Sequence, residues 1–129
     1  MVAAALTEVA GSSAVFDRGF IVYSNAAKSD MLQVMTATLA AFGAVSQEVA
    51  REMAEGALAH SAADLAVSVT GIAGPGGSEC KPEGRVCFGI ARRGRPTVLE
   101  TVEFGALGRD KLRMAARDHA LAMVLTALV

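Results

Sequence analysis

The sequence has no apolar run of about 20 residues, the length that a membrane-spanning helix needs. It also has no tryptophan, and its formal net charge of -1 leaves no basic surplus for binding nucleic acid or an anionic membrane. The opening "MVAAALTEVAG" contains Glu8 and no basic residue, unlike a signal peptide. We therefore expect a cytoplasmic protein with neither a membrane nor a nucleic acid as partner.

Metal-binding patterns are missing as well. Cys80 and Cys87 are the two cysteines, and their spacing fits no zinc site. His60 and His119 have no partner at metal or catalytic spacing, so structural roles are expected for both. The sequence predicts free thiols, no metal and no cofactor.

The 129 residues, 53% of them hydrophobic, are enough for one core, and we predict a single domain over residues 1–129. Strand-like segments alternate with helical ones. Helices are expected at 2–11, after Ser24 or Asn25, near 36–43, from Ser46, and from about Asp110; strands are expected at 19–24, 65–69, 85–92 and 97–104. The last two strands should form an antiparallel hairpin through "RGRP". This order predicts an α/β fold, a three-layer α/β/α sandwich with a mixed, mostly parallel sheet and a late antiparallel hairpin.

Five glycines and two prolines fall within "SVTGIAGPGGSECKPEG", residues 68–84. In open α/β sheets, ligands lie beyond the carboxyl ends of parallel strands, and this stretch follows a predicted strand. Glycine backbone amides there could form a nest for an anion, or the stretch could be a flexible surface connection. The pattern is neither a Walker motif nor G-x-G-x-x-G, so spacing alone leaves both readings open. Lys81 could steer a phosphate or simply face water.

Four blocks resemble the CinA C-terminal domain family, also known as the PncC-type nicotinamide-nucleotide amidases. They are "GSSAVFDRGFIVYSNAAKSDML", "FGAVSQEVAREMAEGA", "TGIAGPGGSECKPEG" and "GRDKLRMAA". The resemblance implies hydrolysis of the carboxamide of nicotinamide mononucleotide to nicotinate mononucleotide and ammonia, in NAD recycling. It implies Tyr23 and Lys28 as catalytic residues. It implies as substrate-binding residues Asn25, Thr70, Gly71, Ile72, Ala73, Gly74, Pro75, Gly76 and Gly77. The glycine loop would then hold the phosphate or ribose, with Lys28 as a base of lowered pKa.

The sequence departs from the family at one decisive place. The family's nucleophilic serine lies in an "ESCTGG" motif after its first strand, and neither motif nor strand is present here. Ser24 and Ser46 are better explained as helix N-caps than as nucleophiles. We therefore expect a truncated and inactive chain, whose open sheet edge and apolar helices favour a homo-oligomer. Alternatives are a non-catalytic nucleotide-binding module or a competence/damage-inducible regulatory piece. Glu83 also replaces a usually apolar residue.

Overall fold

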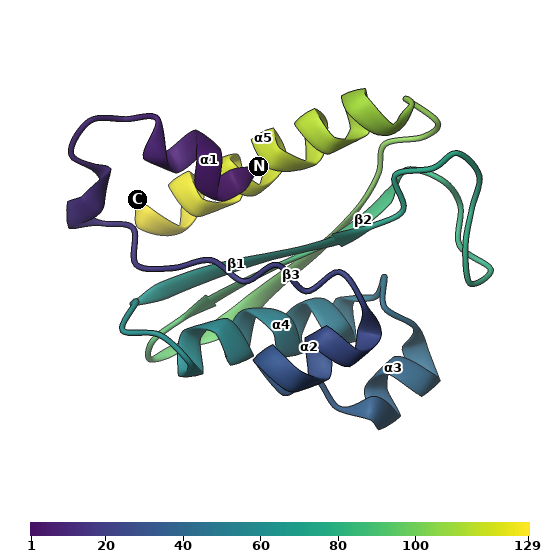
Figure 1. Cartoon of the computed structure of the whole chain (residues 1–129), viewed down its shortest axis with the longest axis horizontal. Helices are drawn as coiled ribbons and strands as arrows, with labels where there is room; N and C mark the ends of the chain where they lie inside the picture. The colour runs from purple at the N-terminus through teal and green to yellow at the C-terminus, as the bar shows by residue number, and fades with distance from the viewer.

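The computed structural model describes all residues from Met1 to Val129. Its centre is a three-stranded sheet in the order β1-β2-β3, formed by β1 (Leu65–Gly71), β2 (Arg85–Arg92) and β3 (Arg95–Glu103) (Figure 1). The hairpin of β2 and β3 is antiparallel, as predicted. Strand β1 is also antiparallel to β2, with Val69 opposite Phe88. The prediction of a mostly parallel sheet is therefore wrong for the strands that form.

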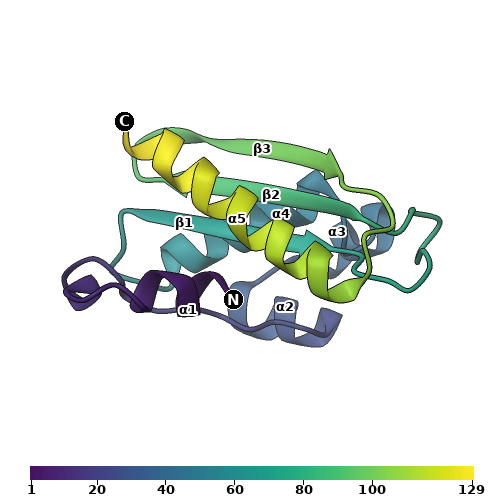
Figure 2. The same cartoon turned by 90° about the horizontal axis from the view of Figure 1, so that it is seen from above.

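Helices cover both faces of this sheet. Helix α4 (Gln47–Ala59) lies on one face, while α5 (Arg109–Leu128) crosses the other face together with α1 (Val2–Thr7) (Figures 1 and 2). The two long helices match their predictions, and Ser46 caps α4 by accepting a hydrogen bond from Val49 N–H at 3.2 Å. None of the helices is both long and apolar enough to cross a membrane.

The main core lies between β2 and α5. Phe88 and Ile90 of β2 are at most 3% exposed and pack with Leu112 and Ala120 of α5. The apolar stripe of α5 thus faces the sheet, because residues three and four apart lie on one side of a helix. The opposite face of β2 packs its Cys87 side chain against α4.

Shorter helices follow local sequence signals. Helix α2 (Asn25–Leu32) is capped by Ser24, and α3 (Thr36–Phe42) ends at Gly43, whose φ of 77° suits glycine. A single 3₁₀ turn spans Ser12–Ala14. Helix α1 ends at Thr7 and not at Gly11, so that predicted helix is shorter than expected.

The predicted strand at residues 19–24 does not form. Residues 19–23 make no backbone–backbone hydrogen bond, and Ile21 is 89% exposed. The segment runs on the β1 side of the sheet (Figure 2) but does not pair with β1. A strand needs a neighbouring backbone to satisfy its N–H and C=O groups, and this segment has none.

Candidate functional site

Lys28 is the one ionisable side chain of the predicted site that the fold buries. It lies in the first turn of α2, is 6% exposed, and donates from Nζ to the backbone carbonyl of Tyr23 at 3.2 Å. Ser24 fixes this geometry, because its Oγ accepts from Ala27 N–H at 3.0 Å and so caps the helix at the residue that directly follows Tyr23. The five-residue spacing thus brings Lys28 back to the end of the preceding segment.

Two opposing effects act on the Lys28 ammonium. Burial lowers the pKa of Lys28, because the charged form loses hydration, and the nearby Glu79 carboxylate partly offsets this by favouring the charge. Burial is the larger effect. A lysine with a lowered pKa is more readily deprotonated, which a proton acceptor requires. Glu79 belongs to the glycine-rich stretch of residues 68–84, so the charge that favours protonated Lys28 comes from that stretch.

Tyr23 and Asn25 have a different environment. The Tyr23 residue is 88% exposed, and its contact with Lys28 is made through the backbone carbonyl and not through the phenol. Asn25 is also exposed, at the first position of α2. The structure therefore brings the main chain of Tyr23, but not its ring, to the ammonium.

The base of the glycine loop is held by structural contacts. Thr70 is buried and donates from Oγ1 to Ala44 C=O at 2.9 Å. Ile72 is 8% exposed, and its backbone pairs with Arg85 and Gly84. These two residues, both predicted to bind substrate, thus fix the loop to the core.

The tip of the loop supplies unpaired donors. The N–H groups of Ala73, Gly74 and Gly77 make no hydrogen bond. Gly74 and Gly76 have φ values of 86° and 79°, which side-chain-bearing residues rarely adopt. Gly76 N–H is already bonded, at 2.6 Å, to Oε1 of Glu83. The loop therefore offers three free amides and one that a carboxylate of the same chain occupies.

Two further charged residues attach the loop to the α3–α4 connection: Lys81, for which the sequence left two roles open, and Glu79, which sequence reasoning missed. Glu79 Oε2 accepts from Ala44 N–H at 3.2 Å, and Lys81 Nζ donates to the carbonyls of Phe42 and Val45. The half-buried Lys81 thus uses its ammonium to bind two backbone carbonyls, a role that the sequence did not predict. The alternation of charge in "SECKPEG" was the available signal, because charged side chains inside a glycine-rich loop can bond its backbone.

No serine takes the place of a nucleophile beside Lys28. Ser24 and Ser46 use their hydroxyls as N-caps, which confirms their predicted roles. Ser29, the neighbour of Lys28 on α2, has a buried Oγ without a hydrogen-bond partner. A hydroxyl without solvent access cannot be reached by a ligand at this surface.

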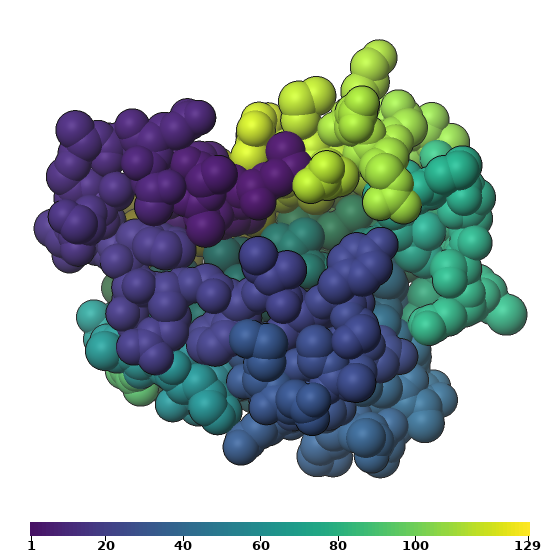
Figure 3. All heavy atoms as spheres, viewed as in Figure 1, coloured from purple at the N-terminus to yellow at the C-terminus, as the bar shows by residue number.

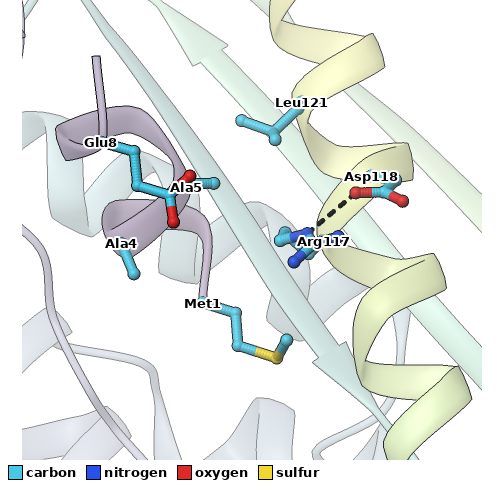
Figure 4. A pocket seen from close by; sticks show the side chains of 7 residues that line it. All are labelled: Met1, Ala4, Ala5, Glu8, Arg117, Asp118 and Leu121. Carbon is cyan, nitrogen blue, oxygen red and sulfur yellow. Dashed lines mark hydrogen bonds and ion pairs between the residues drawn. The ribbon is translucent and has the colours of Figure 1, made fainter.

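One face of the molecule is furrowed. In Figure 3, teal atoms from the middle of the chain are visible at the bottom of a furrow, between the purple N-terminal part and the blue atoms below it. A separate hollow of about 330 Å³ lies between α1 and α5, lined by Met1, Ala4, Ala5, Glu8, Arg117, Asp118 and Leu121 (Figure 4). None of the predicted site residues lines that second hollow.

Comparisons with known proteins agree on one family. The sequence model of the CinA C-terminal domain matches residues 1–128. A nicotinamide-nucleotide amidohydrolase PncC of Enterobacter agglomerans is 46% identical over 130 residues, covering all of this chain and 79% of that protein. A CinA-like protein of Chlorobium phaeobacteroides (strain BS1) is 50% identical over 99% of this chain, which spans only 31% of that relative.

A solved structure agrees equally well. The crystal structure of the competence/damage inducible protein CihA from Agrobacterium tumefaciens superposes with a TM-score of 0.93 at 51% identity. The match covers 97% of this chain and 76% of that one.

Proposed function

Because the chain belongs to the CinA C-terminal domain family, we propose that it carries the nucleotide-binding and proton-accepting parts of a nicotinamide-nucleotide amidase. The reaction replaces the carboxamide nitrogen of nicotinamide mononucleotide by oxygen, giving nicotinate mononucleotide and ammonia. The relative named as that amidohydrolase aligns with the whole of this chain, which supports the substrate class. The reaction recycles a pyridine nucleotide toward NAD.

The observation that carries the proposal is the buried ammonium of Lys28, whose pKa is influenced by Glu79 of the same loop that supplies the free amides. Amide hydrolysis needs a base that takes a proton from the attacking hydroxyl or water, and donors that stabilise the oxyanion. Lys28 suits the first role because burial lowers its pKa. The unpaired N–H groups of Ala73, Gly74 and Gly77 suit the binding of oxygen atoms of the nucleotide. Tyr23 and Asn25 complete the proposed site at the entry to α2.

A second function is favoured by a specific observation. Neither of the two serines closest to Lys28 in the sequence offers a free hydroxyl. Ser24 uses its hydroxyl as the N-cap of α2, and Ser29 Oγ is buried. Covalent catalysis needs an exposed nucleophile within reach of its base. We therefore propose that residues 1–129 alone bind the nucleotide without turning it over, as a binding or regulatory module.

Calorimetry with nicotinamide mononucleotide and an ammonia assay on the same chain test these proposals. We expect saturable binding of the nucleotide and no ammonia above the buffer rate. If ammonia is released, Lys28→Met should lower its rate by at least about a hundredfold, the usual contribution of a general base. Lys111→Met, which removes an exposed lysine from α5, is the matched control and should change neither measurement. A chain that shows no binding of the nucleotide would contradict both functions.

A further inference from the structure

The Glu83 side chain lies inside the bend of the glycine loop. Its Oε1 accepts from Gly76 N–H at 2.6 Å, and a Cβ atom added to Gly74 would lie 2.4 Å from its carboxyl carbon. Glycine at position 74 thus makes room for the carboxylate. The acid therefore occupies the place where an anionic ligand would meet these two glycines.

The negative charge of Glu83 has no cation to balance it. The ion pairs of the structure do not include Glu83, and the nearby Arg85 is paired with Glu103 at 2.6 Å. Lys81, two residues before Glu83, directs its ammonium to two backbone carbonyls. An unpaired carboxylate about 4 Å from a second anion repels it by at least about 1 kcal/mol, and dissolved salt does not screen charges at so short a distance.

We propose that Glu83 is a specificity-determining residue that makes the glycine loop accept uncharged sugar hydroxyls and reject a phosphate. The inference rests on the proposed function, in which this loop holds part of a nucleotide. The free amides of Ala73, Gly74 and Gly77 can donate to neutral hydroxyl oxygens, whereas a phosphate there would meet the Glu83 charge. The phosphate of the nucleotide then lies away from the loop tip.

Inorganic phosphate is the probe, added to ¹⁵N-labelled chain while the backbone amide shifts of Gly74, Gly76 and Gly77 are followed. Glu83→Val removes both the charge and the acceptor of Gly76 N–H, and Glu83→Gln removes the charge but keeps an acceptor. We expect phosphate to bind Glu83→Val with a Kd at least about tenfold lower than wild type. Glu83→Gln should fall between the two.

Glu79→Gln is the matched control. It removes the same charge from the same loop but leaves the bond between Glu83 and Gly76 intact, so its Kd should stay within about threefold of wild type. An equal gain in phosphate affinity in Glu79→Gln and Glu83→Val would overturn the proposal, because the lower negative charge of the loop as a whole would then explain the effect. Equal phosphate affinity in wild type and both Glu83 variants would overturn it too.

Glu83→Gln keeps the test decisive should Glu83→Val disturb the loop, since it is nearly isosteric with the native residue. The readout needs neither nicotinamide mononucleotide nor turnover. A failure of the proposed amidase function would appear in the calorimetry and the ammonia assay, and a failure of this inference would appear in the amide shifts.

Discussion

Strand β2 and the segment Gly19–Tyr23 have similar apolar, strand-forming sequences but opposite environments. Six of the eight residues of β2 are buried, and the strand pairs with β1 on one side and β3 on the other. In Gly19–Tyr23 only Val22 is buried, and no backbone–backbone hydrogen bond forms. The difference shows that apolar and β-branched residues make a strand only where a neighbouring backbone receives them.

The two regions are also held by different forces. β2 is fixed by two ladders of hydrogen bonds and by side chains packed on both faces. The segment is fixed by Val22 in the small cluster under α2, and by the bond from Lys28 Nζ to Tyr23 C=O. The free energy of unfolding should therefore respond strongly to changes in β2. Around the segment it should respond only to changes at the few residues that hold it, Val22 and Lys28.

The largest expected effect comes from Phe88→Ala in β2. The Phe88 side chain is fully buried, with its ring centroid 4.6 Å from that of His119 and 6.5 Å from that of Phe104. Its loss leaves a cavity and should lower the free energy of unfolding by about 3–5 kcal/mol, measured by urea denaturation. Val98→Ala, at a 56% exposed position of β3, should cost less than about 0.5 kcal/mol. Similar losses of unfolding free energy in Phe88→Ala and Val98→Ala would show that the buried core of β2 does not dominate stability.

A smaller effect is expected from the pH dependence that Lys28 introduces. Burial lowers the pKa of Lys28 below its ordinary value of about 10.4, so between these two values the unfolded chain binds more protons than the folded one. The free energy of unfolding should therefore rise with pH as Lys28 loses its proton in the folded state, up to the unfolded value. At low pH both states are protonated, and this rise is absent.

Lys28→Met should remove that alkaline rise in the free energy of unfolding. The rise that is lost should be smaller than the loss of unfolding free energy caused by Phe88→Ala. The measurement is urea denaturation of wild type and variant at pH 7, 9 and about 10, below the unfolded pKa. Lys111→Met, which removes an exposed lysine, should keep the rise. If the free energies of unfolding of wild type and Lys28→Met differ by the same amount at every pH, then folding does not lower the pKa of Lys28.

Local signals in the sequence predicted the elements whose causes are local. Ser24 and Ser46 cap their helices as expected, Gly43 ends α3, and the hairpin of β2 and β3 forms around its short connection. The direction of β1 and the fate of residues 19–24 depend on which backbones meet in space. Sequence periodicity does not carry that information, and both of those predictions were wrong.

The candidate site divides in the same way. The spacing of Tyr23 and Lys28 predicted that these two residues meet, and the structure brings the Tyr23 carbonyl to the Lys28 ammonium, whose pKa burial lowers. The loop contacts of Glu79 and Lys81 join residues 35 to 39 positions apart, so no local pattern could predict their partners. Only the short alternation of charge in the loop marked them as unusual.

The smallest expected effect lies in the segment itself, where neighbouring residues face opposite ways. Ile21 is 89% exposed and Val22 is 9% exposed. Ile21→Ser should change the free energy of unfolding by less than about 0.5 kcal/mol, because little apolar surface leaves the core. Val22→Ser, the adjacent control, should cost about 1–3 kcal/mol through lost burial among Leu32, Val34 and Met53. Urea denaturation of the two variants measures both. If Ile21→Ser were as costly as Val22→Ser, the outer side of the segment would be covered in solution. The segment would then differ from β2 in its missing backbone partner and not in its burial.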